Sequence, residues 1–260
     1  MKFLFFIAIG SFLITTVSPA VTMAERDLPT SDHDFTSLIS HFERLGFDLQ
    51  TYLDDSRFEV YDGIGDRFRN SAERRSLSLD EYKNVLGYQG KRSHIVNFID
   101  THQNVLREAE ERYAIPRYVI AAIIGIESDF GQNIGRHNPF NVYVSMYLED
   151  YRAEFARAQL EELLKFVERH GIDVFELKSS YAGAMSFAQF IPYSLNRWFV
   201  GDNIFDMNNN ILSVANYLAH FKEREGDIEG AVFRYNPSRL YTQAVMSLAR
   251  DAEELYAAGS

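Results

Sequence analysis

The sequence predicts a mainly α-helical protein. Apolar residues recur every three or four positions in several long segments, such as residues 35–52, 94–113 and 151–169, which is the spacing of an amphipathic helix. Glycines stand where helical segments end, as Gly87 and Gly171 do, and glycine is the usual residue just past a helix. The alternation of apolar and polar residues that is typical of strands is nearly absent.

The first half of the chain is expected to hold three helical segments. Residues 35–52 carry an apolar stripe that includes Leu38, Phe42 and Leu49. Ser78 and Glu81 form the pattern of a capping box, which opens a short helix that ends at Gly87. Residues 94–113 are expected to form a longer helix with its apolar residues on one side.

The second half is also expected to be helical. Pro116 suits the first turn of a helix, because its missing N–H would have no partner there, and this helix should run to about Phe130. Residues 178–199 are rich in Gly, Ala and Phe and are expected to form a turn followed by a closely packed helix. Further helices are expected at residues 151–169, 211–223 and 241–256.

The first 24 residues have the pattern of a secretory signal. Lys2 gives a positive start, residues 3–17 are almost entirely apolar, and Ala20 and Ala24 mark two cleavage points. This run is shorter than the about 20 residues of a membrane span, so we expect no membrane span after cleavage, with an uncleaved anchor as the alternative. The expected localisation is the periplasm, with release from the cell as the alternative.

Composition excludes several classes of protein. The chain has 260 residues and 46% apolar residues, enough for one large domain or two small ones. A net charge of -11 argues against nucleic-acid binding, which needs basic surfaces facing phosphates. The absence of cysteine excludes disulfides, thiolate metal sites, cysteine nucleophiles and a lipid-modified N-terminal cysteine.

Glu127 is the first candidate catalytic residue. Ile120, Ile123 and Ile124 form an apolar stripe, and Glu127 continues it at the same angular position. A carboxylate there meets the unfavourable C-terminal end of the helix dipole, by about 0.3–1 kcal/mol, and the cost of burial. Both effects raise the pKa of a carboxyl group, and a neutral acid near pH 7 is what cleavage of an acetal needs. The alternative is a helix-end glutamate that turns toward water.

Glu127 has no evident partner carboxylate. Asp129 lies about 200° around the helix from it and faces away. Ordinary retaining and inverting glycosidases use two carboxylates. If Glu127 acts alone, the substrate must supply the second group, which indicates sugars with an N-acetyl group or a well-placed hydroxyl.

Two further clusters contain candidate binding residues. Within residues 179–192, small residues surround Gln189, whose amide needs a hydrogen-bond partner in an apolar run. A sugar would satisfy it; the alternative is tight packing with Gln189 bonded to a neighbouring backbone. Residues 234–238 and Tyr241 form the other cluster, which could equally be a turn. Tyr217 lies on an apolar helix and could equally be core.

The order and content of four blocks resemble the B-type membrane-bound lytic murein transglycosylases. The resemblance is good from about residue 106 to residue 249 and faint over residues 30–105. The blocks are I-I-G-I-E-S-D-F-G (123–131), L-K-S-S-Y-A-G-A-M-S-F-A-Q-F-I-P (177–192), S-V-A-N-Y-L (213–218) and R-Y-N-P-S (234–238).

This resemblance implies a lysozyme-like helical core with an N-terminal helical extension and a single catalytic glutamate, Glu127. Glu127 would protonate the oxygen between N-acetylmuramic acid and N-acetylglucosamine and then accept the proton of the muramyl C6 hydroxyl, leaving a 1,6-anhydromuramyl end. The substrate-binding residues implied by position are Ser180, Gln189, Tyr217, Tyr235, Asn236 and Tyr241. The implied divisions are the signal (1–24), an N-terminal helical subdomain (25–105), the catalytic core (106–250) and a C-terminal tail (251–260).

The chain departs from the resembled family at two places in the core. Many relatives have glycine at the position of Ser186. Many also carry an Asp-rich calcium loop after the Gln-Phe-x-Pro block, where this chain has a shortened loop at residues 198–210 without the calcium-loop order of ligands. We therefore expect no bound calcium there, no other metal and no cofactor.

The sequence leaves three alternatives to the hypothesis of a lytic transglycosylase that acts on peptidoglycan glycan strands. A lysozyme-like muramidase would use the same fold with water as the nucleophile, and fold alone does not separate the two. An inactive peptidoglycan-binding protein would be expected to lack the acid, and Glu127 is present. In a helical interaction protein the four blocks would be core packing alone.

Overall fold

The computed structural model describes residues 33–69 and 77–259 of the chain. Within these residues helices form nearly all the regular structure, and three isolated β-bridges occur in place of strands. The mainly α-helical class predicted from the sequence is confirmed. The expected signal, residues 1–24, lies outside the described residues. In the described ranges, no helix is both long and apolar enough to cross a membrane.

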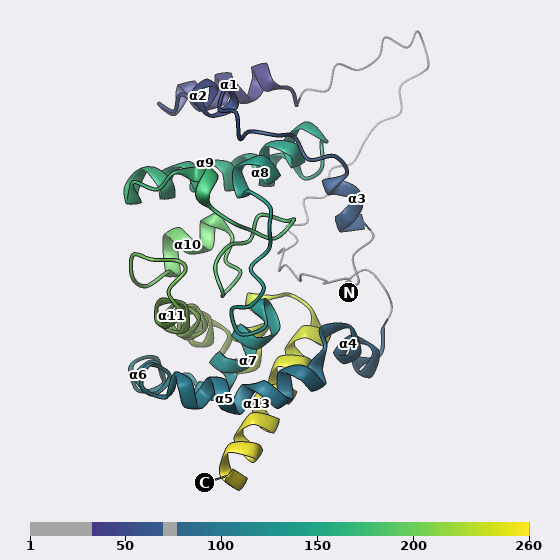
Figure 1. The fold of residues 1–260 in the computed structure, drawn as a ribbon, viewed down its shortest axis with the longest axis vertical. Helices are drawn as coiled ribbons and strands as arrows, with labels where there is room; N and C mark the ends of the chain where they lie inside the picture. The colour runs from purple at the N-terminus through teal and green to yellow at the C-terminus, as the bar shows by residue number, and fades with distance from the viewer. Residues whose placement is uncertain (1–32, 70–76, 260) are drawn as a thin grey trace.

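Figure 1 shows helices gathered at the two ends of the molecule with a connecting region between them. One end contains α1 (Phe35–Arg44), α2 (Leu49–Leu53), α3 (Ile64–Arg69), α8 (Pro139–Leu148) and α9 (Ala153–His170). The other end contains α4 (Leu79–Leu86), α5 (Tyr88–Thr101), α6 (Gln103–Tyr113), α7 (Arg117–Ser128) and α13 (Arg239–Gly259). The remaining elements are the 3-10 helix η2 (Val174–Glu176), α10 (Pro192–Trp198), α11 (Met207–Glu225) and α12 (Ile228–Tyr235).

The described part of the N-terminal region is divided between these two ends. α3 packs on α8, whereas α4, α5 and α6 pack around α7, α11 and α13. Residues 33–105 therefore support both ends of the molecule and do not gather in one place. At the other terminus, the residues beyond 250 continue α13 as far as Gly259.

α7 is the central helix. It packs against α5, α6, α11 and α13, and its residues from Val119 to Ser128 are buried. Helices touch on several sides of it, so small residues such as Ala121 and Ala122 are needed where neighbours approach closely. Its hydrophobic sequence thus places the end of α7, which carries Glu127, in the interior of the fold.

Several predicted helices are shorter than expected, for local reasons. The segment 35–52 is broken where Gly46 adopts a φ of 87°, and Asp48 then caps α2 by accepting a hydrogen bond from the N–H of Thr51. The segment 94–113 is broken at His102, between α5 and α6. The capping box of Ser78 and Glu81 is confirmed.

Three α-helices of the described residues, α3, α8 and α12, were not expected from the sequence. α8 is buried around most of its circumference, so its sequence lacks a polar face. Asn138 caps it by accepting hydrogen bonds from the N–H groups of Phe140 and Asn141, and Pro139 occupies its first turn. α12 spans only Ile228–Tyr235 and is opened by Asp227, whose carboxylate accepts from the N–H of Gly230.

Candidate active site

The side chain of Glu127 lies in the last turn of α7 and is held by a residue of another helix. It is 8% exposed. The hydroxyl of Tyr241, in α13, donates a hydrogen bond of 2.6 Å to Oε1 of Glu127. Tyr241 is itself fully buried. The contact fixes the orientation of a carboxyl group that is nearly buried.

The corner after Glu127 turns sharply. Asp129, Phe130 and Gly131 have φ values of 53°, 58° and 87°, so three consecutive residues are left-handed. The Ser128 hydroxyl stabilises the corner, because it accepts a hydrogen bond from the N–H of Gly131 and donates one to the carbonyl of Ile124. The chain therefore leaves α7 directly after the catalytic candidate instead of extending past it.

Asp129 follows the end of α7, in a left-handed conformation, and its side chain contacts another helix. Its carboxylate forms an ion pair of 3.1 Å with the ammonium group of Lys91, from α5. Lys91 is buried at 7% exposure, and the side chain of Asp129 is 40% exposed. The carboxylate nearest to Glu127 in the sequence thus pairs with a residue of a different helix, α5.

The segment facing this corner is a loop as far as Ile191, and the closely packed helix expected after a turn in residues 178–199 is confined to its end. Gly183, Ser186 and Gln189 have φ values of 79°, 68° and 51°, which a right-handed helix cannot contain. The backbone instead forms bridges between Ser179 and Met185 and between Met185 and Phe190. Helical structure is limited to α10.

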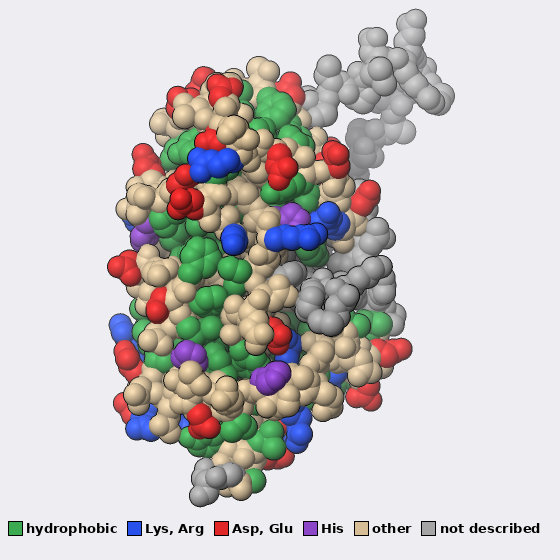
Figure 2. Space-filling model, in the orientation of Figure 1, with side chains coloured by type: hydrophobic (Ala, Val, Ile, Leu, Met, Phe, Trp, Pro, Cys, Tyr) green, Lys and Arg blue, Asp and Glu red, His purple; other side chains and the backbone are tan. Residues whose placement is uncertain are grey.

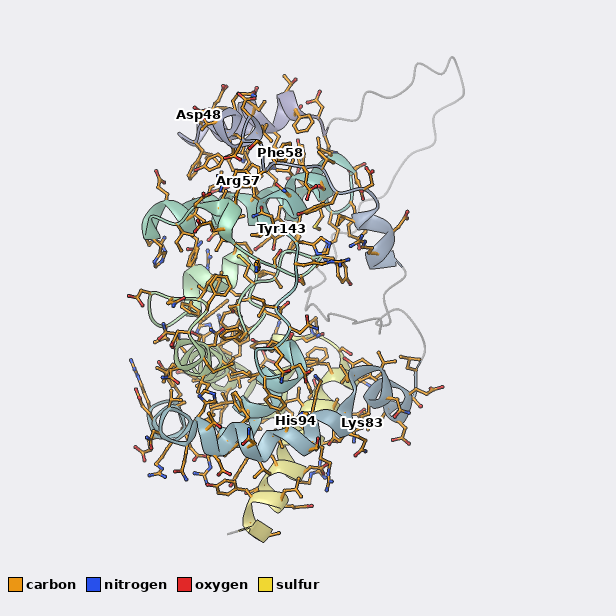
Figure 3. All side chains as sticks on the ribbon, in the orientation of Figure 1. Asp48, Arg57, Phe58, Lys83, His94 and Tyr143 are labelled. Carbon is orange, nitrogen blue, oxygen red and sulfur yellow. The ribbon has the colours of Figure 1, made fainter. Side chains whose placement is uncertain are left out.

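A tyrosine from α8 fixes this loop. Tyr143, which is labelled in Figure 3, donates a hydrogen bond of 3.0 Å from its hydroxyl to the carbonyl of Gly183. A Cβ atom on Gly183 would lie 2.3 Å from the Tyr143 ring, so only glycine fits at that position. Asn210 fixes the other side, because its Oδ1 accepts from the N–H of Ala188 at 3.0 Å.

The sequence left open whether the side-chain amide of Gln189 bonds to a sugar or to neighbouring backbone, and the structure allows both. Its Nε2 donates to the carbonyl of Ser186 at 2.9 Å and to that of Ile134 at 3.4 Å. Its Oε1 is buried and has no hydrogen-bond partner among the described residues. The backbone contacts orient the amide, and the unpaired oxygen is available to a ligand, since burying an unsatisfied acceptor is costly.

Asn236 and Ser180 differ in what they offer. Asn236, at the end of α12, is 3% exposed, and its Nδ2 has no partner in the described part of the chain. Ser180 is fully buried, and its hydroxyl accepts a hydrogen bond of 3.3 Å from the N–H of Ala184. The geometry therefore makes Asn236 a candidate donor to a ligand and Ser180 a support of the loop.

Tyr217 and Tyr235 lie in an aromatic cluster whose hydroxyl groups are used internally. The Tyr217 hydroxyl donates to the carbonyl of Arg234 at 2.8 Å, and the Tyr235 hydroxyl donates to that of Ala188 at 2.5 Å. Their rings are 4.9 Å apart, and Trp198 lies 4.9 Å from Tyr217. Burial raises the pKa of both phenols. The two tyrosines thus offer ring surface more than hydroxyl groups.

Trp198 also belongs to this cluster, although no motif of the sequence indicates a role for it. The chain has a single tryptophan, just after the Gln-Phe-x-Pro block, and that position is the only signal that could have indicated it. In Figure 2 hydrophobic side chains form a continuous area in the middle of the face shown, around the places where Figure 1 draws α7, α10 and α11. Hydrophobic surface of this kind suits contact with the apolar faces of sugar rings.

The polar side chains of the loop after α10 bond within the loop and at the start of α11. Asp206 caps α11 by accepting from the N–H of Asn209, and the Oδ1 of Asn203 accepts from the N–H of Phe205. The side-chain amide of Asn209 donates to the carbonyl of Asn203. Over the described ranges, no group of three or more His, Cys, Asp or Glu residues could hold a metal ion. These hydrogen bonds close the loop on itself.

Comparison with known proteins gives the family. Residues 41–230 match the family described as Transglycosylase SLT domain. This match covers well over half of the chain. The chain belongs to the Transglycosylase SLT domain family.

Members of this family and their solved structures resemble the chain in sequence and fold. The membrane-bound lytic murein transglycosylase B of Escherichia coli K12 is 32% identical over 139 residues, which are 51% of this chain and 38% of that protein. Catenated SltB1 of Pseudomonas aeruginosa superposes with a TM-score of 0.76 at 24% identity, covering 85% of this chain and 97% of that one. SltB3 of the same organism, in complex with NAG-NAM-pentapeptide, gives 0.73 at 20% identity, covering 84% and 78%.

These likenesses confirm the expected lysozyme-like helical fold. The match to the Transglycosylase SLT domain family includes Glu127, Gln189 and Tyr217 and ends before Tyr235 and Tyr241. The match begins at residue 41 and therefore includes much of residues 30–105, where the resemblance seen in the sequence is faint. The chain nevertheless matches little more than a third of the length of the Escherichia coli relative.

Proposed function

We propose that this chain is a peptidoglycan lytic transglycosylase with Glu127 as its single acid and base. The observation that carries the proposal is the placement of Glu127, which is nearly buried at the end of α7 and held by Tyr241. Family membership supports the reaction class. The commitment of Asp129 to Lys91 supports the use of one carboxyl group and not two.

In the first step Glu127 donates its proton to the bridging oxygen between N-acetylmuramic acid and N-acetylglucosamine. The bond from C1 to that oxygen breaks, and positive charge develops at C1 of the muramyl sugar. The acetamido group of the same sugar stabilises this charge, a role that a second carboxylate has in ordinary glycosidases.

In the second step the muramyl C6 hydroxyl attacks C1, and the carboxylate of Glu127 accepts the hydroxyl proton. Glu127 thereby returns to its starting protonation state, and no water is consumed. The product is a 1,6-anhydromuramyl end. The hydrogen bond from Tyr241 keeps the carboxyl group in one orientation through both proton transfers.

The proposed substrate contacts follow from the unpaired polar atoms. Oε1 of Gln189 would accept a hydrogen bond from a sugar hydroxyl or an acetamido N–H, and Nδ2 of Asn236 would donate to an acetamido carbonyl. The rings of Tyr217 and Tyr235 would form part of the cleft wall. We expect Ser180 to act through the loop that it stabilises. The signal pattern of residues 1–24 and this substrate together support a periplasmic location.

Digestion of purified sacculi tests the proposal. The released fragments are analysed by mass spectrometry, which separates anhydro ends from reducing ends by the mass of one water. Anhydro ends support the transglycosylase. Reducing ends would assign the chain to the muramidases, and no release under conditions where it binds sacculi would assign it to inactive binding proteins.

A further inference from the structure

Two arginines and a histidine from distant parts of the sequence meet beside the proposed active site. Nη1 of Arg67, in α3, donates a hydrogen bond of 3.0 Å to Nε2 of His137. Arg136 precedes His137 in the chain, and both arginines are exposed. Burial, together with the positive charges of Arg67 and Arg136, holds the pKa of His137 below its usual value, against the opposing charge of Glu59. The two guanidinium groups therefore act on the same imidazole.

Hydrogen bonds anchor the two chain segments that carry the cluster. The carboxylate of Glu149, at the end of α8, accepts hydrogen bonds from the N–H groups of Gly63 at 2.6 Å and Gly65 at 2.7 Å. This contact anchors the start of α3 and so positions Arg67. His137 is fixed through its backbone, which exchanges two hydrogen bonds with Ser179.

Neither guanidinium is neutralised within the described residues. Arg67 and Arg136 form no ion pair there, in contrast to Arg57, whose guanidinium contacts the carboxylates of Asp55 and Asp173. The chain as a whole has a net charge of -11. Two exposed arginines that form no ion pair with any described residue mark a site where an anion is favoured in an acidic protein.

The cluster lies along the same loop as the proposed sugar contacts. The amide of Gln189 reaches the carbonyl of Ile134, and three residues of chain, at most about 11 Å, separate Ile134 from His137. His137 pairs with Ser179, which begins the loop that contains Gln189. A ligand bound at Gln189 could therefore place a side branch over the arginines.

We propose that Arg67, Arg136 and His137 form a subsite for the carboxylate groups of the stem peptides carried by the glycan strand. This inference rests on the proposed function, because the peptide is attached to the muramyl sugar. Arginine suits the task, since its planar guanidinium pairs with a carboxylate through two parallel hydrogen bonds. The subsite would add affinity for peptide-bearing strands without taking part in bond cleavage.

The test measures the Kd of binding and not the rate of cleavage, so that its result does not depend on the reaction. The Glu127→Gln protein is titrated calorimetrically with soluble muramyl oligosaccharides that carry stem peptides and with the same sugars after an amidase has removed the peptides. We expect the peptide-bearing form to bind about three- to tenfold more tightly. Adding Arg67→Gln and Arg136→Gln should remove this preference and leave the Kd of the peptide-free sugars unchanged.

Arg107→Gln is the matched control, because Arg107 is exposed on α6, far from α3 in Figure 1. It should keep the preference for peptide-bearing sugars. The inference is overturned if the parent shows no preference, or if the double arginine change leaves the preference intact or weakens both ligands equally. Failure of the proposed function would show separately, as the absence of anhydro ends in the sacculus digest.

Discussion

The hydroxyl of Tyr241 lies 2.6 Å from Oε1 of Glu127 and joins two helices across 114 positions of sequence. A neutral phenol that donates to a carboxyl group fixes its orientation without adding charge. Burial, with the negative charge of Glu127 as the next cause, raises the pKa of Tyr241 well above its usual value. The phenol therefore remains a donor throughout the pH range in which the protein works.

Replacing Tyr241→Phe should weaken catalysis without removing it. The variant loses one buried hydrogen bond, which costs about 1–2 kcal/mol of unfolding free energy, and we expect kcat to fall by about tenfold because the acid is less well oriented. Tyr88→Phe is the control: Tyr88 is also buried and donates to a carboxylate, Asp251 of α13. It should lose similar stability and keep full activity. Equal kcat values for the two variants would show that the Tyr241 contact is structural only.

Glu127→Gln should abolish fragment release while the fold is retained. Loss of general acid–base catalysis costs about a factor of 10² to 10⁴ in rate, whereas the amide still offers an oxygen to Tyr241. Because a buried ionisable group is removed, the thermal midpoint should stay unchanged or rise. Calorimetry with a sacculus digest measures both effects. A clearly lowered midpoint would mean that Glu127 stabilises the fold.

The ion pair of Lys91 and Asp129 should act on catalysis more than on stability. Asp129 is 40% exposed in its side chain, so water can replace the ammonium group, and Lys91→Met should change the unfolding free energy by less than about 1 kcal/mol. We expect kcat to fall several-fold with KM unchanged, because the corner after Glu127 is no longer tied to α5. Lys165→Met, which breaks a helix-surface pair with Glu161, is the control and should leave kcat unaffected.

A double-mutant cycle separates positioning from a general loss of charge. If Lys91 acts through Asp129, then Asp129→Asn should give the same fall in kcat, and the double variant should be no worse than either single one. Additive losses would refute the positioning role.

Ser186 should tolerate glycine and reject valine. It is fully buried with a φ of 68°, a conformation that costs a residue with a side chain about 1–2 kcal/mol. Ser186→Gly relieves that strain but adds unfolded-chain entropy of about 0.5–1 kcal/mol, so the unfolding free energy should change by less than about 1 kcal/mol. Ser186→Val should cost at least about 2 kcal/mol, because a β-branched residue fits this φ poorly. Urea denaturation measures both; a large loss with glycine would contradict the account.

Stability should fall steeply above pH 10. Burial raises the pKa of Tyr143, Tyr235 and Tyr241 well above the ordinary value of 10.0. A folded-state pKa above the unfolded one means that the folded protein binds more protons once the pH passes 10. The unfolding free energy then falls with pH, by about 1.4 kcal/mol per pH unit for each such tyrosine. Stability below the unfolded pKa is unaffected by these groups.

Denaturant titrations at pH 9, 10 and 11 measure this slope. Tyr143→Phe should reduce the slope of the unfolding free energy with pH by the contribution of one tyrosine. The absorbance of tyrosinate should rise only as the protein unfolds. A flat profile between pH 10 and 11, or ionisation of these phenols in the folded protein, would contradict the burial argument.

The sequence by itself determined the helical class, the capping box of Ser78 and Glu81, and the position of Glu127 on the buried face of its helix. These features depend on residues within a few positions of one another, where spacing and local hydrogen bonding decide the outcome. The resemblance to a known family joined the single candidate residues into one ordered set of motifs.

Only the tertiary structure decided which residues surround Glu127 and what each one does. Tyr143 holds the loop at Gly183 and Asn210 holds it at Ala188, on either side of the left-handed Ser186, so the helix expected within residues 178–199 is limited to α10. Tyr241 reaches Glu127, and Arg67 reaches His137, through the packing of helices far apart in the chain. Such contacts depend on how whole helices are placed against one another, and no local pattern encodes that placement.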